Sequence, residues 1–291
     1  MTGRLPDFVI IGAMKCGTSS LHDRLGALPG FFMSEPKEPN FFSDDPVWER
    51  GLPWYCSLFA PASPTALCGE SSTHYTKLPT HPAASGRLAA TLPNAKLVYV
   101  MRNPVERLVS QYRHEWTRKE VREPFEVAVR LHSRFVDYSC YQMQLEPYLR
   151  AFGPHAVLPV FFERLVAFPA AELARVLGFL GAEAALAATR GSELPARNRA
   201  GERLRPSPLR EALLRLPGAG LVQRALPTAF RERLKDFWRP PRQLDVPSEL
   251  REELSERIDA DLARLGGLLG ARLSVAEWRS RVLAAPLEWV T

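Results

Sequence analysis

Apolar runs and helical spacing alternate along most of the chain. Buried strands are expected at Phe8–Ile11, Ala95–Met101 and Ala156–Phe162, the last a further central strand although Pro159 interrupts it. Helices are expected over 82–92, 141–152, 171–181 and 250–269, and the last should pack back on the sheet. Strands that alternate with helices predict an α/β fold, with a central, mainly parallel sheet between layers of helices.

A glycine-bracketed loop joins the first strand to the first helix. It runs from Gly12 to Ser20, and the leucines that follow share one helical stripe. The loop amides and the positive end of the helix dipole favour an anion such as phosphate. This strand, loop and helix predict a three-layer fold of the P-loop type with an anion site at the end of the strand.

The cation of this loop lies at an unusual position. Gly12 and Gly17 have the Walker A spacing, but Thr18 follows Gly17 where a nucleoside triphosphatase carries lysine. Lys15, inside the loop, supplies the positive charge instead. The loop by itself leaves two interpretations open, an anion site or a buried strand that meets a glycine-containing turn.

A second helix start follows the strand over 95–101. Asn103 is a good N-cap, Pro104 fits the first turn and Glu106 has the position of a capping box. Ligands of such sheets bind beyond the carboxyl ends of the strands, so this helix start should face the glycine loop. Arg102 can donate paired hydrogen bonds to a phosphate, and Ser110 lies about two turns along the helix from Asn103 on the same face.

A carboxylate in the proline-broken loop over 34–43 is a candidate base. A hydroxyl is a poor nucleophile until its proton is removed, and a carboxylate such as Glu38 can do this if its surroundings tune its pKa. The alternative is that Glu38 forms a surface ion pair with Lys37 or Arg24. His74, in a later polar loop, is either a second candidate base or a hydrogen-bonded loop histidine.

Three motifs, in this order, resemble sulfotransferases of the carbohydrate type. They are the loop with Lys15, Lys37-Glu38 followed by Phe41-Phe42, and Arg102 with Ser110. The resemblance implies transfer of a sulfuryl group from 3′-phosphoadenosine 5′-phosphosulfate (PAPS) to an acceptor hydroxyl, with no metal. It implies Glu38 and Lys15 as catalytic residues, and His74 is the alternative base. The expected donor-binding residues are Lys15, Cys16, Gly17, Thr18, Ser19, Ser20, Arg102 and Ser110.

The segment after Leu67 departs from the pattern of this family. Carbohydrate sulfotransferases often show Glu-Lys-[Ser/Thr]-Pro-x-Tyr, and the chain keeps Glu70, Ser72 and Tyr75 but has Ser71 in place of the lysine. The departure weakens the expectation of a heparan-type acceptor. Hydroxyls of saccharides, lipids and natural products all remain open.

Length, composition and charge bear on the number of domains and on the kind of partner. At 291 residues and 46% hydrophobic, the chain is expected to form a single domain over 1–291. Its net charge is +6, and residues 197–242 carry twelve Arg or Lys against four acidic residues. This basic segment and the C-terminal helix, together 197–291, should belong to the same domain. The segment fits an anionic ligand or surface, or a solvated helical face; no nucleic acid partner is expected.

Cysteine spacing and hydropathy bear on metal binding, disulfides and location. The four cysteines are scattered, so neither a zinc site nor a disulfide framework is expected, and Cys16 fits a small loop-filling residue better than a reactive thiol. No apolar run approaches the roughly 20 residues that span a bilayer, and no signal peptide pattern is present. We therefore expect a cytoplasmic protein.

Two alternative functions stay open. A P-loop kinase would share the strand and loop, but it should carry lysine after Gly17 and an aspartate that binds magnesium. A non-catalytic polyanion-binding protein would explain the basic segment over 197–242, but not the anion loop.

Overall fold

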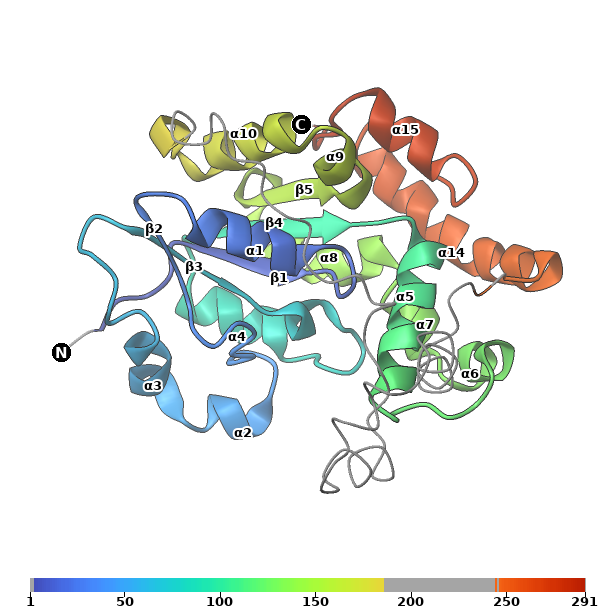
Figure 1. Ribbon diagram of the computed structural model, residues 1–291, viewed down its shortest axis with the longest axis horizontal. Coiled ribbons are helices and arrows are strands. Elements are labelled where there is room, and N and C mark those ends of the chain that lie inside the picture. Colours follow the sequence, from blue (N-terminus) through green and yellow to red (C-terminus); the bar gives the residue numbers. More distant parts are fainter. Residues whose placement is uncertain (1–2, 186–243, 245, 291) are drawn as a thin grey trace, which may run out of the picture.

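The computed structural model describes residues 3–185, 244 and 246–290 (Figure 1). One sheet of five strands lies at its centre, in the order β2-β3-β1-β4-β5, and every pair of neighbours is parallel. The strands are β1 (Phe8–Gly12), β2 (Phe31–Met33), β3 (Leu67–Ser71), β4 (Lys96–Met101) and β5 (Val157–Phe161). The parallel α/β fold expected from the sequence is confirmed. The basic segment over 197–242 lies outside the described residues.

β5 is an edge strand, so the expectation of a central strand there is wrong. All of its residues are buried, as in the central strand β1, which explains why the apolar pattern did not reveal the edge. Pro159 pairs with Tyr99 of β4. An edge strand leaves some N–H groups without a partner in the sheet, so a proline is tolerated there.

Helices cover both faces of the sheet and complete three layers (Figure 1). α1 (Thr18–Gly26) lies on one face, while α4 (Ala84–Thr91) and α8 (Tyr141–Phe152) lie on the other. α10 (Pro169–Leu180) begins beside α1, where Arg24 donates a hydrogen bond of 3.4 Å to the carbonyl of Pro169.

The C-terminal helix α14 (Ser248–Leu268) packs against α8 and α5 (Pro104–Thr117). It was expected to pack on the sheet, but α8 lies between them. Asp261 of α14 accepts hydrogen bonds from the backbone N–H groups of Gln142 (2.8 Å) and Met143 (3.0 Å) in the first turn of α8. The two helices are therefore joined by a cap as well as by apolar packing.

The remaining helices are short or peripheral. They are α2 (Asp45–Trp48), α3 (Gly51–Ser57), α6 (Phe125–Leu131), α7 (Arg134–Asp137), α9 (Phe162–Ala167) and α15 (Trp278–Ala284), with the 3-10 turns η1 (Thr73–Thr76) and η2 (Pro154–Ala156). Within the described residues, no helix combines the length and the apolar character needed to cross a membrane.

The chain changes direction across the sheet next to β1. It leaves β1 toward β2 and β3 on one side and later crosses to β4 and β5 on the other. Such a switch point leaves a crevice at the carboxyl ends of the strands. The loop over 13–17, the end of β4 and the start of α5 all meet there.

Candidate active site

The loop between β1 and α1 is held in a fixed conformation. The N–H of Ala13 donates a hydrogen bond of 2.8 Å to the carbonyl of Val100 in β4, which pins the loop to the neighbouring strand. Lys15 and Gly17 have left-handed backbones, with φ of 70° and 91°. Gly17 is the N-cap of α1 and has no side chain to cover the first turn. The first-turn N–H groups therefore face the crevice, as an anion site requires.

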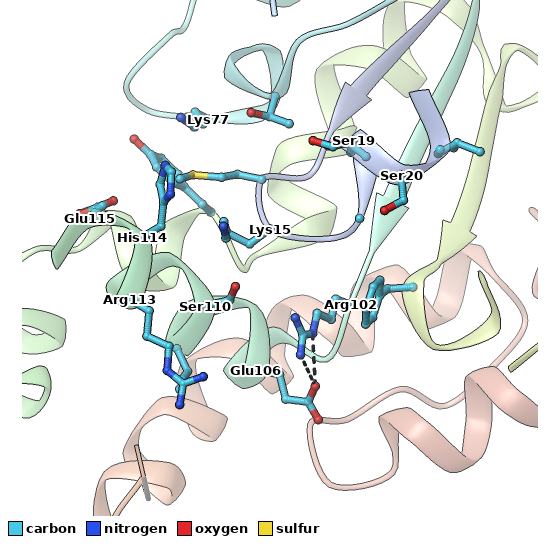
Figure 2. A pocket seen from close by; sticks show the side chains of 18 of the residues that line it. Lys15, Ser19, Ser20, Lys77, Arg102, Glu106, Ser110, Arg113, His114 and Glu115 are labelled. Carbon is cyan, nitrogen blue, oxygen red and sulfur yellow. Dashed lines mark hydrogen bonds and ion pairs between the residues drawn. The ribbon is translucent and has the colours of Figure 1, made fainter. Parts of the chain in front are cut away.

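This loop forms one wall of a cavity of about 1670 Å³. Figure 2 shows Lys15 of the loop near the side chains of α5, with Ser19 and Ser20 of α1 on one side and Arg102 and Ser110 on another. The predicted site residues that line the cavity are Lys15, Gly17, Thr18, Ser19, Ser20, Glu38, His74, Arg102 and Ser110. Segments from 15 to 110 thus contribute to a single cavity.

Cys16 is the predicted site residue that the cavity lining does not include. Its side chain is buried in the core, with the sulfur 3.8 Å from the hydroxyl of Tyr141. Burial raises the pKa of the Cys16 thiol to about 12. The thiol therefore packs the loop against the core, and a reactive thiolate does not form there.

Glu38 lies at the cavity on the loop after β2. The loop is fixed by the N–H of Glu38, which donates a hydrogen bond of 3.0 Å to the carbonyl of Ser71. Its carboxylate accepts hydrogen bonds from Nζ of Lys37 (2.7 Å) and Oγ1 of Thr73 (3.3 Å). Burial by itself would raise the pKa of Glu38, but the charge and hydrogen bond of Lys37, with Lys77 and His74 behind it, lower it below the usual value. Glu38 is therefore a carboxylate at neutral pH.

His74 both lines the cavity and is hydrogen-bonded, so the two interpretations from the sequence coexist. Its Nδ1–H donates to Oδ1 of Asp44 at 2.8 Å, and its ring stacks on that of His81, with centroids 4.7 Å apart. The ligand atoms of these three side chains lie within 4.8 Å of one another. A metal bound by both histidines would have to lie in the plane of each ring. The two rings are stacked with 17° between their planes, so the planes do not meet close to the ring nitrogens. The arrangement fits a hydrogen-bonded cluster.

Arg102, which lies between β4 and α5, and Ser110 of α5 both line the cavity (Figure 2). Arg102 donates to Glu106 at 2.8 Å and lies over the ring of Phe162, with its guanidinium carbon 4.7 Å from the centroid. Glu106 is half-exposed, so this ion pair contributes little stability and can yield to a stronger anion.

The start of α5 follows the predicted cap in part. Oδ1 of Asn103 accepts a hydrogen bond of 3.2 Å from the N–H of Glu106, as expected of an N-cap. The reciprocal half of the capping box is absent, because the N–H of Asn103 donates to Glu163 of α9 at 2.7 Å. Glu106 is thereby left to pair with Arg102.

Ser71, the position that departs from the family pattern, is buried away from the cavity. Its hydroxyl lies 2.9 Å from Nδ1 of His22 in α1. Glu70 beside it accepts hydrogen bonds from the hydroxyls of Tyr55 (2.6 Å) and Tyr75 (2.9 Å) within the core. Burial raises the pKa of Glu70 to about 7, against the effect of these hydrogen bonds. Glu70 is part of the core and not of the cavity.

Sequence reasoning missed several polar residues of the cavity. Lys77, Thr80, His81 and Tyr138 line it beyond Glu38 and His74. They come from the segment between η1 and α4 and from the residue after α7, and no motif connects them. The one available signal was the position of Lys77 and His81 shortly after a strand end, where site residues of parallel sheets gather.

Comparison with known proteins places the chain among sulfotransferases. Residues 36–185 match the sulfotransferase family. Human heparan sulfate glucosamine 3-O-sulfotransferase 6 is 31% identical over 255 residues, which cover 81% of this chain and 70% of that protein. Mouse heparan sulfate glucosamine 3-O-sulfotransferase 3B1 is 34% identical over 187 residues, which cover 61% of this chain and 46% of that protein.

A solved sulfotransferase shares the fold. The crystal structure of a sulfotransferase from Alicyclobacillus acidocaldarius superposes with a TM-score of 0.65 at 24% identity, covering 95% of this chain and 99% of that one. The fold similarity thus extends over almost the whole chain, and the matched segment includes Glu38, Arg102 and Ser110. The chain belongs to the sulfotransferase family.

Proposed function

We propose that this sulfotransferase takes its sulfuryl group from PAPS and transfers it to a saccharide hydroxyl in the cavity between the β1–α1 loop and α5. The observation that carries the proposal is the convergence of Lys15, Glu38 and the Arg102–Ser110 pair on one cavity. The reaction needs a site for the 5′-phosphosulfate, a base for the acceptor and a site for the 3′-phosphate. Lys15 with its loop, Glu38 and the Arg102–Ser110 pair match these three needs.

The donor would lie along the loop and the start of α5. The 5′-phosphosulfate fits the N–H groups at the start of α1, with Lys15 and the hydroxyls of Thr18, Ser19 and Ser20 beside it. The 3′-phosphate fits Arg102 and Ser110, because a guanidinium can donate two parallel hydrogen bonds to a phosphate. Arg102 would then exchange its bond to Glu106 for the stronger phosphate contact.

Transfer would proceed by direct displacement at sulfur. The acceptor oxygen forms the new O–S bond while its proton passes to the carboxylate of Glu38. The S–O bond to the donor phosphate breaks, and adenosine 3′,5′-bisphosphate (PAP) leaves with the additional negative charge. Lys15 and the loop amides stabilise that charge as it develops. Glu38 later releases its proton to solvent.

The acceptor class rests on the relatives and on the polar wall beyond Glu38. Two relatives are named as sulfotransferases of heparan sulfate glucosamine, which supports a saccharide acceptor here. Hydroxyls and imidazoles such as those of Thr80, Tyr138, His74 and His81 can hydrogen-bond to sugar hydroxyls. The single-domain organisation of 1–291, the cytoplasmic location and the absence of a nucleic acid partner stay predictions.

Substitution of Glu38 tests the role of the base. In Glu38→Gln the side chain keeps its size but cannot accept the proton, so we expect PAP release from PAPS with a panel of saccharide acceptors to fall by about 10²-fold or more. PAP binding, measured by calorimetry, should stay close to wild type. Glu35→Gln, an exposed change in the same loop, is the matched control and should keep full turnover. Wild-type turnover in Glu38→Gln would exclude this residue as the base.

A further inference from the structure

Lys77 is a cavity cation that the proposed reaction does not use. It directly follows η1 and lines the cavity. Figure 2 places it on the opposite side of Lys15 from Arg102 and Ser110, away from the expected donor site. Its ammonium lies 5.9 Å from the centroid of the Tyr138 ring.

The side chain of Lys77 is half-buried, and within the described residues its ammonium has no hydrogen-bonded acceptor. Burial lowers the pKa of Lys77, and the charges of Glu38, Glu115 and Asp44 partly oppose this effect. Its contact within the described part of the chain is the Tyr138 ring, with no carboxylate or carbonyl at hydrogen-bonding distance. A buried charge that lacks such a partner is costly, and an anion bound in the cavity would supply one.

The carboxylates around Lys77 already have partners. Glu38 accepts from Lys37 at 2.7 Å. Glu115 accepts from Arg134 at 2.8 Å and from Gln111 at 2.6 Å. The protein therefore neutralises its own acidic groups near this point and leaves the cation to a ligand.

Lys77 also lies close to the proposed base. Both side chains line the cavity, and the positive charge of Lys77 lowers the pKa of Glu38 while the negative charge of Glu38 raises that of Lys77. Beside Lys77, the hydroxyls of Thr80 and Tyr138 are hydrogen-bonded to each other. Lys77 and these hydroxyls together offer a cation and neutral hydrogen-bonding groups, which suits a saccharide that carries an acidic substituent.

We propose that Lys77 determines acceptor specificity by binding an anionic group, a carboxylate or a sulfate, of a saccharide whose hydroxyl is presented to Glu38. The inference rests on the proposed function and deepens it. It assigns the acceptor to acidic saccharides and gives Lys77 a role in acceptor binding that is separate from donor binding.

A matched pair of glycosides tests this role. The probes are 4-nitrophenyl β-D-glucuronide and 4-nitrophenyl β-D-glucoside, which differ only in a carboxylate at the sixth sugar carbon, titrated by calorimetry into PAP-saturated protein. Wild type should bind the glucuronide about tenfold more tightly, as expected for one charge-assisted hydrogen bond. In Lys77→Met the preference should disappear, and in Lys77→Arg, which keeps the charge, part of it should return.

Two controls separate the outcomes. Lys96 is the first residue of β4, at the end of the strand away from Arg102, and it does not line the cavity. Lys96→Met should therefore keep the preference for the glucuronide. The affinity for PAP should be the same in wild type and in Lys77→Met, which also shows that the variant is folded. Failure of wild type to bind PAP would contradict the proposed function itself, whatever the glycosides do.

Three results would overturn the role of Lys77 while PAP binding is intact. They are equal affinities of wild type for the two glycosides, no binding of the glucuronide, and a preference that persists in Lys77→Met. A kcat in Lys77→Met that falls equally for both glycosides would instead place the ammonium on the transferred sulfuryl group, and it would overturn the assignment to the acceptor as well.

Discussion

The ionisation of Glu38 results from two opposing effects. Burial favours the neutral acid, whereas the ammonium of Lys37, 2.7 Å away, favours the carboxylate and contributes most to lowering the pKa. A base of the proposed kind has to be ionised before the acceptor binds. Lys37 would therefore keep the proposed base ionised.

The pH dependence of turnover reports this balance. Because the pKa of Glu38 lies below its ordinary value, wild-type kcat/KM should fall only when the pH drops below the ordinary range of a glutamate. In Lys37→Met the burial effect dominates, so the pKa of Glu38 rises and the acidic limb of the pH profile should move to higher pH. Lys96→Met serves as the control and should leave the limb in place. An unchanged limb in Lys37→Met would mean that Glu38 does not govern the profile.

The sequence predicted those site residues that lie within recognisable motifs. Lys15, Glu38, Arg102 and Ser110 were found from motifs that resemble those of carbohydrate sulfotransferases, and all four line the cavity. Lys77 could not be found this way, because its significance depends on Tyr138 and on other residues that only the tertiary structure brings near it.

The β1–α1 loop depends on a left-handed backbone at its end. Gly17 has a φ of 91° and is the N-cap of α1. A Cβ at this position would lie 2.9 Å from Cδ2 of Phe162, which also supports Arg102. The conformation that turns the amides toward the cavity therefore excludes larger residues.

Replacement of this glycine should damage both the fold and donor binding. For Gly17→Ala we expect a loss of about 1–3 kcal/mol in the free energy of unfolding by urea, from backbone strain and the close contact with Phe162. PAP affinity should weaken as well, because the loop amides shift. Gly86→Ala, at an exposed position of α4 with nothing within 4 Å of the added Cβ, should be neutral or slightly stabilising. Equal stability of the two variants would contradict the constraint at Gly17.

Local sequence patterns predicted where helices lie, but not all of the residues that complete their N-terminal caps. The range expected over 141–152 is that of α8, and Asn103 caps α5 as predicted. The partners that complete these helix starts come from elsewhere: Glu163 bonds to Asn103, and Asp261 caps α8 from α14. A cap supplied from more than one hundred residues away leaves no trace in local sequence.

The order of the strands in the sheet places the two proposed anion sites, at the β1–α1 loop and at the start of α5, next to each other. β1 and β4 are neighbours in the sheet, so the loop after one and the helix after the other open on the same cavity. The sequence predicted this convergence, because parallel strands end at a common edge. It did not predict the edge position of β5, since burial on both faces gives edge and central strands the same apolar pattern.

The proposed reaction requires that this cavity bind a 3′-phosphorylated adenosine nucleotide. The most direct measurement is a calorimetric titration of wild-type protein with PAP, with ATP and magnesium titrated in parallel. We expect PAP to bind about 100-fold more tightly than ATP or better, because Arg102 and Ser110 would contact a 3′-phosphate that ATP lacks. Tighter binding of ATP with magnesium would exclude PAPS as the donor and would favour a kinase-like use of the loop.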